Sequence, residues 1–177
     1  MVGIPGSGKT QFAKQFSETF NAPILEAEHV TSHARDGQAA TKLIYAFVAE
    51  LLKTKQSIVI DGIGSSRKDR MELNKLLRDH GYEPLLVWVQ TDTDTAKQRV
   101  AKSGKTLNTS LDHAAAVFSA PHPTEKPLVI SGKHTYATQA RTVLKRLSGG
   151  ARPTPSQHES QAPVIPAVRR PGTIRVQ

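Results

Sequence analysis

The stretch Gly3-Ile4-Pro5-Gly6-Ser7-Gly8-Lys9-Thr10 decides the fold of this chain. It fits the pattern G-x-x-x-x-G-K-[ST] at every fixed position, which is typical of a loop that wraps the phosphates of a nucleoside triphosphate. Glycines let the backbone bend so that successive N–H groups point inward at phosphate oxygens. We expect Lys9 to reach the β- and γ-phosphates of ATP and the Thr10 hydroxyl to ligate Mg²⁺. The residues predicted to bind the nucleotide are Gly3, Pro5, Gly6, Ser7, Gly8, Lys9 and Thr10.

A phosphate loop normally has a strand before it and a helix after it, and this sequence shows the helix more clearly than the strand. Downstream, Phe12, Phe16 and Phe20 recur at a spacing of four and predict a helix whose positive dipole end faces the phosphates. Upstream, a phosphate loop normally follows a buried strand of about five residues. Only Met1 and Val2 precede Gly3 here, so we expect a truncated first strand or a true start that lies upstream.

Short apolar runs alternate with helical patterns as far as residue 148. Such alternation implies right-handed crossovers and a mostly parallel sheet covered by helices on both faces. The expected strands are 23–27, 57–61, 85–89 and 127–131. The expected helices, besides the one after the loop, are one marked by Leu43, Phe47 and Leu51 and those over 67–80, 93–103 and 135–147.

Asp61 is the second candidate site residue. It ends the buried run Ser57-Ile58-Val59-Ile60, and parallel sheets bind their ligands at the carboxyl ends of the strands. A carboxylate at that edge holds Mg²⁺ through water in phosphate-loop proteins. The alternative is that Asp61 only caps the exit of the strand toward Gly62.

Composition separates a folded region, 1–148, from a tail, 149–177. The tail holds five prolines and few large apolar residues, so we expect it to be disordered. Its charged residues are Arg152, Arg169, Arg170 and Arg175 against Glu159. A solvated tail and a weak contact to RNA or another anion both fit this basic composition.

The whole chain has a net charge of +9, which suits nucleic acid but also phosphate-bearing substrates. It has no cysteine, which excludes disulfides and thiolate metal sites. No apolar run reaches the length of about 18 residues that suggests a membrane-spanning helix. The start also lacks the basic and apolar regions of a signal peptide. We therefore expect a cytoplasmic protein that does not contact membranes.

The loop GIPGSGKT, the run Ile58-Val59-Ile60-Asp61-Gly62 and a helix with an arginine after LLVWVQTDTD resemble small P-loop kinases. The most similar branch contains the kinase domain of polynucleotide kinase and AAA-type ATP-binding proteins, and the resemblance covers residues 1–148. It implies a three-layer P-loop NTPase fold with a mostly parallel five-stranded sheet, the first strand truncated here. It also implies an ATP and Mg²⁺ site, phosphoryl transfer to a hydroxyl or phosphate acceptor, and a lid whose arginines neutralise the transferring phosphoryl group.

Two positions depart from this family pattern. Members usually carry D-x-x-R after the second strand, where this chain has Leu25-Glu26-Ala27-Glu28-His29-Val30. Glu28 is the expected stand-in for orienting the acceptor, and Glu26 is the alternative. The lid helix normally offers two arginines four apart, but here Arg99 is followed by Ser103. Lys102 and Lys105 would compensate only in part, because lysine cannot form a bidentate fork.

The remaining basic residues have two interpretations each. Arg99 belongs either to the lid or to an ordinary basic solvent face. Arg67 and Arg70 either contact the acceptor, as the resemblance implies, or form ion pairs within their own helix. The sequence therefore favours a kinase with Lys9, Glu28 and Arg99 as catalytic residues and an acceptor that the residues do not identify. The alternative is a nucleotide-binding regulatory module or weak NTPase with an RNA-binding tail.

Overall fold

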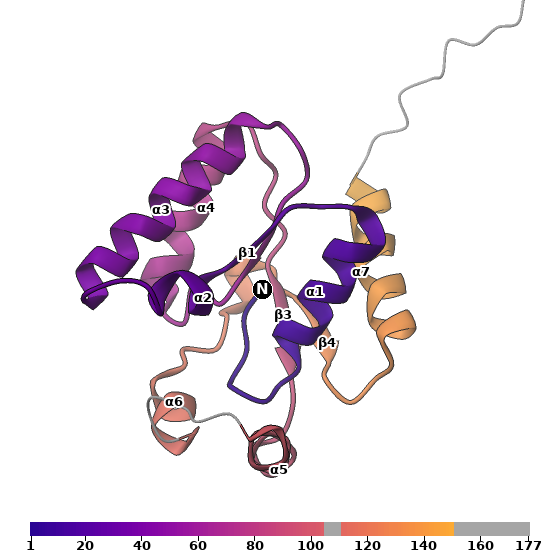
Figure 1. Cartoon of the computed structure of the whole chain (residues 1–177). Coiled ribbons are helices and arrows are strands. Elements are labelled where there is room, and N and C mark those ends of the chain that lie inside the picture. Colours follow the sequence, from indigo (N-terminus) through magenta and orange to yellow (C-terminus); the bar gives the residue numbers. More distant parts are fainter. Residues whose placement is uncertain (105–110, 151–177) are drawn as a thin grey trace, which may run out of the picture.

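The computed structural model describes residues 1–104 and 111–150, and Figure 1 shows strands near the centre with helices packed around them.

Several helices begin or end at residues that favour helix boundaries. The carboxylate of Asp36 accepts from Ala39 N before α3, Ser66 and Asp69 form a capping box at α4, and Gly104 ends α5. The α-helices are α1 (Lys9–Phe20), α2 (Ala27–Thr31), α3 (Gly37–Lys53), α4 (Arg67–Asp79), α5 (Thr93–Ser103), α6 (Leu111–Val117) and α7 (Tyr136–Gly150).

The strands form two parallel pairs. The first pair is β1 (Ile24–Glu26) with β2 (Val59–Asp61), and the second is β3 (Val87–Gln90) with β4 (Leu128–Ser131). The prediction of parallel strands is confirmed, whereas a continuous five-stranded sheet is not: the described residues form two sheets of two strands each.

Met1 and Val2 lie between these two sheets. The backbone of Val2 pairs with β3, donating to Val87 O at 2.9 Å and accepting from Val89 N at 2.9 Å. On the other side, the Met1 ammonium group donates to the carbonyl of Ile60 in β2. Burial lowers the pKa of this ammonium group. The segment that feeds the phosphate loop therefore lies between the two strand pairs, with Val2 bonded to β3 and Met1 bonded to β2.

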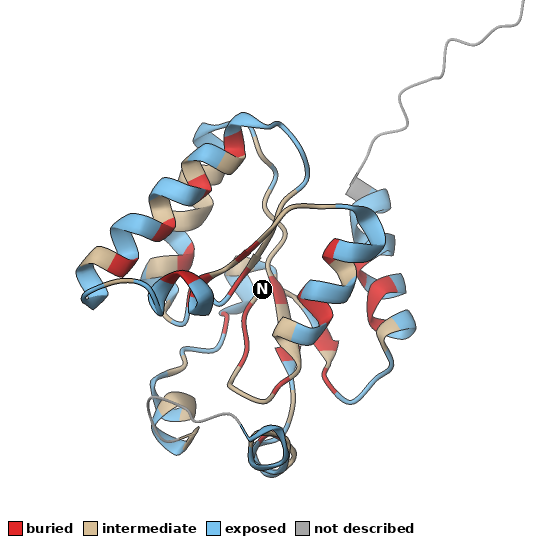
Figure 2. Ribbon diagram, in the orientation of Figure 1, coloured by how far each residue is buried: buried red, intermediate tan, exposed pale blue. Residues whose placement is uncertain are grey.

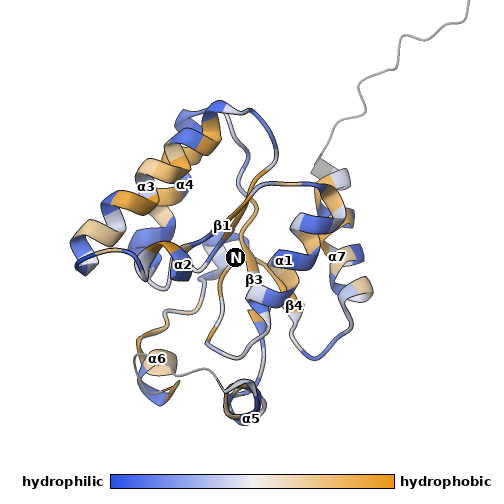
Figure 3. Cartoon of the chain, in the orientation of Figure 1, coloured by the Kyte–Doolittle hydropathy of each residue, from blue (hydrophilic) through white to orange (hydrophobic). Residues whose placement is uncertain are grey.

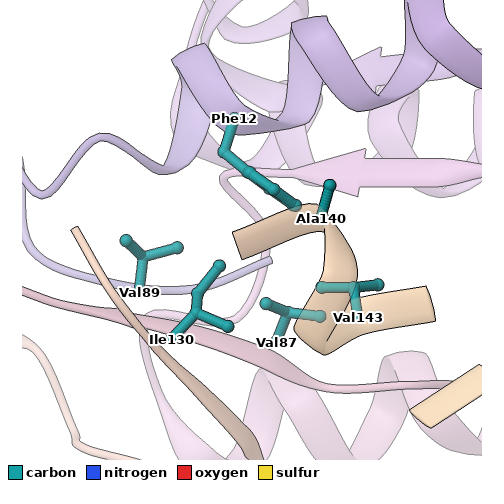
Figure 4. Packing of buried hydrophobic residues seen from close by; sticks show 6 residues of the cluster. All are labelled: Phe12, Val87, Val89, Ile130, Ala140 and Val143. Carbon is teal, nitrogen blue, oxygen red and sulfur yellow. The ribbon is translucent and has the colours of Figure 1, made fainter. Parts of the chain in front are cut away.

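Each sheet has its own hydrophobic cluster (Figure 2). Around β3 and β4, the buried side chains come from α1, α7 and the strands: Phe12, Val87, Val89, Ile130, Ala140 and Val143 (Figure 4). Around β1 and β2, the buried side chains are Leu25, Ala27, Val30, Ile44, Val48 and Leu52, with partly buried residues of α4 packed against them. Helix α1 contacts β1 and β2 as well as α7, and its Phe12 belongs to the cluster around β3 and β4.

The buried face of α3 differs from the apolar stripe that identified the helix in the sequence. Leu43 and Phe47 are exposed, at 37% and 47%, whereas Ile44 and Val48 face the core. The helix is hydrophobic enough to carry apolar residues on more than one face, as the orange bands along α3 in Figure 3 show. Spacing thus located α3 correctly but selected a face one residue away from the packed one.

The last helix is longer than predicted. It continues through Ser148 and Gly149 to Gly150, past the expected end at Leu147. The rest of the predicted tail, from residue 151, lies outside the described residues. The proposed anion or RNA contact of that tail therefore has no structural counterpart here, and the same holds for Lys105, which was considered as a lid cation.

Candidate functional site

Three glycines shape the loop between Val2 and α1. Gly6 has φ +78°, and a Cβ atom there would lie 2.4 Å from the carbonyl oxygen of Ala96 in α5. Gly3 has φ +153°, and a Cβ atom there would lie 2.6 Å from Val89 O. Gly8, at φ +95°, is the N-cap of α1. The loop is therefore packed directly onto the backbones of β3 and α5, which only glycine permits at this distance.

Helix α1 starts at Lys9, so the N–H groups of its first turn and its positive dipole end face the loop. No side chain caps this end. A helix N-terminus of this kind binds phosphate readily, since both the N–H groups and the dipole favour an anion. Lys9 and Thr10 are half-buried in the first turn, where the sequence places the phosphate and Mg²⁺ ligands.

Ser7 lies at the centre of the loop and is fully buried. Its carbonyl accepts from the Thr91 hydroxyl at 3.1 Å and from Arg99 Nη1 at 3.4 Å. Its own hydroxyl has no hydrogen-bond partner among the residues that the structure describes. A buried hydroxyl left without a partner costs about 1–3 kcal/mol, so such groups in native proteins usually have a specific reason.

Asp61 contacts the loop helix directly. The Thr10 hydroxyl donates to Asp61 Oδ2 at 2.6 Å, joining the end of β2 to the first turn of α1. Asp61 is 4% exposed, and its second oxygen, Oδ1, has no hydrogen-bond partner within the described part of the chain. This geometry brings together the two residues predicted to hold Mg²⁺, which lie 51 positions apart in the sequence.

The chemistry of this pair fits a magnesium ion. A hydroxyl and a carboxylate are hard oxygen ligands, and Mg²⁺ is commonly held by one or two carboxylates, several waters and substrate phosphates. The unpartnered Asp61 Oδ1 is a buried acceptor that a metal-bound water or the ion itself would satisfy. Residues 1–104 and 111–150 contain no cluster of three or more His, Asp or Glu side chains that would form a metal cage. A metal here would therefore depend on the phosphates for its remaining ligands.

Arg99 lies against the loop. From α5, its Nη2 donates to Gly132 O at 2.9 Å while Nη1 donates to Ser7 O at 3.4 Å. Arg99 is half-buried and both of its Nη atoms donate to backbone carbonyls, which argues against an ordinary solvent face. Its position places a fixed positive charge beside the loop, 3.7 Å from the point where a Cβ of Gly8 would lie.

The two candidate glutamates have different surroundings. Glu28, in α2, is exposed and lines the same cleft as Lys9, Thr10 and Arg99. Glu26, at the end of β1, is ion-paired with Lys14 of α1 at 2.9 Å. The structure thus places Glu28, the preferred candidate, at the cleft, whereas the alternative is already paired with a lysine.

The cleft has a volume of about 740 Å³ and includes a segment that sequence reasoning missed. Gly132, Lys133 and His134, between β4 and α7, line it opposite the first turn of α1. A Cβ atom on Gly132 would lie 2.1 Å from Ser7 O, so the turn needs glycine to lie against the phosphate loop. Lys133 is also paired with Asp92 at 2.6 Å, and this lysine lowers the pKa of the Asp92 carboxyl. The signal was available: these residues follow a predicted parallel strand at its carboxyl end.

The two arginines after the Asp61 loop have different surroundings. Arg67 is exposed, and its Nη2 donates to Thr124 Oγ1 at 3.4 Å. Arg70 is 2% exposed and forms a bidentate ion pair with Glu125, in the 3-10 turn Pro123–Glu125. Neither forms the ion pair within its own helix that was considered. Burial against Glu125 leaves Arg70 no open face for an acceptor.

Comparison with known proteins places this geometry in a family. The model of a family described as an AAA domain matches residues 1–121. Among curated proteins, none matches the sequence of this chain. Within the described residues, no helix has both the length and the apolar character to cross a bilayer.

Solved structures of kinases share the fold at low sequence identity. A gluconokinase from Sinorhizobium meliloti is 16% identical, with a TM-score of 0.63 over 84% of this chain and 89% of that chain. The APS kinase of Mycobacterium tuberculosis, solved with AMPPNP and APS, is 15% identical, with a TM-score of 0.65 over 83% and 94%. Shikimate kinase from Aquifex aeolicus is 17% identical, with a TM-score of 0.57 over 84% and 94%.

These likenesses show the fold alone, whereas the family match covers more than half of the chain. The matched residues include the glycine-shaped loop, Thr10 and Asp61. The chain therefore belongs to the AAA domain family of P-loop NTPases, and its fold is that of the small P-loop kinases.

Proposed function

We propose that this protein is an ATP-dependent kinase that transfers the γ-phosphate of ATP to a hydroxyl or phosphate group of a small acceptor. The observation that carries the proposal is the contact between Thr10 and Asp61 beneath the glycine loop, with one carboxylate oxygen left unpartnered. The similar structures support it, since they include a gluconokinase, an APS kinase and a shikimate kinase. The acceptor could also be a nucleoside or a polynucleotide 5′-end, as the sequence resemblance implies.

The nucleotide phosphates would lie on the loop from Gly3 to Thr10, at the N-terminus of α1. Backbone N–H groups and the Lys9 ammonium would neutralise the β- and γ-phosphates. Thr10 and Asp61 would hold Mg²⁺, which supplies charge neutralisation to the phosphates when bound. Most of the catalysis would come from positioning and electrostatic stabilisation, as in other phosphoryl transfers.

Glu28 would act on the acceptor hydroxyl, and Arg99 would act on the transferring phosphoryl group. For a hydroxyl acceptor, the acceptor oxygen forms a bond to the γ-phosphorus as the bond to the bridging oxygen of ADP breaks. The Glu28 carboxylate would accept the hydroxyl proton, which keeps the charges balanced. Arg99 would neutralise charge on the transferring group after exchanging its present carbonyl partners, Ser7 and Gly132, for phosphate oxygens.

A second function has one specific observation in its favour. Ser103 stands where the resemblance implies a second lid arginine, which leaves Arg99 as the only arginine of α5. A single arginine finger can contribute several orders of magnitude in rate. A protein without the full set would bind ATP and hydrolyse it slowly, acting as a nucleotide-dependent regulatory module.

One experiment separates these functions. The full chain is incubated with γ-labelled ATP and Mg²⁺ together with nucleosides, oligonucleotide 5′-ends, sugars, sugar acids or small hydroxy acids. A kinase transfers label to one of these classes and forms ADP much faster in its presence. Formation of ADP at an unchanged slow rate, with label appearing only in inorganic phosphate, would favour the regulatory module. Lys9→Ala serves as the control that assigns any activity to the loop.

A further inference from the structure

Two acidic residues lie side by side at the carboxyl ends of the first strand pair. Glu26 and Asp61 are direct partners in the parallel register of β1 and β2. Neighbouring strands lie about 4.8 Å apart, and residues paired in register point to the same face of a sheet. A second carboxylate therefore stands next to the proposed magnesium ligand, on the face covered by α1.

Helix α1 contacts both carboxylates with residues one turn apart. Thr10 donates to Asp61 Oδ2 at 2.6 Å, and Lys14 pairs with Glu26 Oε2 at 2.9 Å. Residues separated by four lie on the same helix face, so the helix presents a hydroxyl to one carboxylate and an ammonium group to the other. The hydrogen bond from Lys14 to Glu26 also raises the pKa of the lysine, so the ammonium group stays charged.

The two carboxylates differ in what remains open to a cation. Asp61 is buried and keeps Oδ1 without a partner among the described residues. Glu26 has its negative charge compensated by a lysine, and its side chain is 28% exposed. Proteins bind Mg²⁺ through one or two carboxylates together with substrate phosphates. Whether the site offers one carboxylate or two depends on whether Glu26 is paired with Lys14.

We propose that Lys14 is a positioning residue that holds Glu26 away from the metal of Asp61, so that the site offers a single carboxylate. With one carboxylate, a divalent ion binds weakly to the nucleotide-free protein and enters with the phosphates of ATP. Without Lys14, Glu26 and Asp61 together form a two-carboxylate site that takes up the ion alone. This inference rests on the proposed function, in which Asp61 holds the metal.

The test measures Mn²⁺ binding to the full chain without nucleotide, by electron paramagnetic resonance titration of the free ion. Lys14→Met should tighten this binding by about tenfold or more, the scale on which groups around a metal change its affinity. Lys53→Met is the matched control, because Lys53 also pairs with a glutamate, Glu50, at 2.7 Å but lies in α3. Lys14→Gln is a second version that keeps a polar side chain if the methionine variant folds poorly.

A double variant separates direct ligation from a general change in charge. Lys14→Met with Glu26→Asp keeps the negative charge but retracts the carboxylate by one methylene group. Loss of most of the tightening in this double variant supports ligation by Glu26. Full tightening in the double variant, or none in Lys14→Met, would overturn the inference.

Asp61→Asn distinguishes this failure from failure of the proposed function. If Asp61→Asn weakens Mn²⁺ binding in the presence of ATP while Lys14→Met changes nothing without ATP, only the role of Lys14 is wrong. If Asp61→Asn binds Mn²⁺ with ATP as tightly as the wild type does, Asp61 is not a metal ligand and both proposals fail.

Discussion

The phosphate-loop region and the surroundings of Arg70 both contain buried polar groups, yet they differ in how completely the hydrogen bonds of those groups are made. Arg70 donates to both oxygens of Glu125, at 2.7 and 3.0 Å, and to the carbonyls of Gly64 and Ser119, at 3.1 and 2.8 Å. In the loop region, Ser7 Oγ and Asp61 Oδ1 are buried without partners in the described chain.

This difference separates a structural site from a binding site. A buried ion pair whose side chains already have partners within the protein is costly to break and offers little to a ligand. A buried polar atom without a partner lowers stability, and such an arrangement persists where another requirement maintains it. The Arg70 site joins the start of α4 to the segment before β4. The loop region instead keeps Ser7 Oγ and Asp61 Oδ1 without partners in the described chain, which fits the proposed binding of phosphate and metal.

The largest expected effect comes from breaking the Arg70 site. Arg70→Ala leaves the Glu125 carboxylate, 7% exposed, without its cation. Loss of one partner of a buried pair costs about 3–5 kcal/mol, a large part of a domain's total stability. Urea unfolding at neutral pH measures this. Arg67→Ala, three residues away and exposed, should change the unfolding free energy by no more than about 0.5 kcal/mol. Equal effects of the two variants would contradict the distinction.

Lys9→Ala should affect function rather than stability. Removing the lysine withdraws a positive charge from the phosphates, and loss of one preorganised stabilising group typically costs about 10²–10³-fold in rate, or about 2.7–4 kcal/mol. The measurement is ATP turnover with and without acceptor, beside the unfolding free energy, which should stay within about 1 kcal/mol of the wild type. If the variant kept wild-type ATP affinity and turnover, the loop would not be part of the nucleotide site.

Asp61→Asn should weaken the metal dependence more than nucleotide binding without metal. We expect the Mg²⁺ concentration for half-maximal turnover to rise by about 10–100-fold, or about 1.4–2.7 kcal/mol. Asp79→Asn, at the exposed end of α4, is the charge-matched control. If both variants gave the same metal titration, Asp61 would be only a cap at the end of β2.

Ser7→Ala tests the unpartnered hydroxyl itself. Because Ser7 Oγ is fully buried and has no partner among the described residues, its removal should raise the unfolding free energy of the nucleotide-free protein by about 1 kcal/mol. The added stability on binding Mg²⁺ and ATP should become smaller. Thermal unfolding with and without ligand gives both numbers, with Ser65→Ala as the exposed control. A destabilised nucleotide-free variant would show that the hydroxyl has a structural role.

The smallest effect is confined to acid conditions. Hydrogen bonds from Arg70 lower the pKa of Glu125 below its ordinary value of 4.5. The folded pKa is thus below the unfolded one, so the stability from this group is complete above pH 4.5 and is lost as the pH falls through the folded pKa. Unfolding free energies from pH 6 to 3 should fall less steeply in Glu125→Gln than in the wild type. Parallel curves for the two proteins would contradict the pairing.

The parts of this molecule that sequence predicted well are those fixed by local chemistry. The loop from Gly3 to Thr10, the start of α1 and the four strand positions follow from backbone freedom, dipoles and apolar runs over a few residues. Asp61 was predicted to hold Mg²⁺, as Thr10 was, because the carboxyl ends of parallel strands are where such sheets bind ligands. Asp36 and the pair Ser66 and Asp69, at the starts of α3 and α4, are comparable local signals that were not used.

The parts that were missed depend on contacts between distant segments. Leu43 and Ile44 are equally compatible with the spacing of α3, and only packing against β1 and β2 decided that Ile44 is buried. Glu125, 55 residues from Arg70, was not a candidate partner, since nothing in the sequence relates their positions.

The sequence by itself determined that this protein has a phosphate-binding loop, parallel strands and an acidic strand end, because each depends on the properties of neighbouring residues. Only the tertiary structure decided which charges are compensated. In the fold, Lys14 pairs with Glu26, and Arg70 pairs with Glu125. Glu28 lines the cleft, and Asp61 Oδ1 has no hydrogen-bond partner in the described part of the chain. The physical reason is that Coulomb and hydrogen-bond energies depend on distances of a few ångströms, and in a folded chain those distances are set by packing rather than by separation in the sequence.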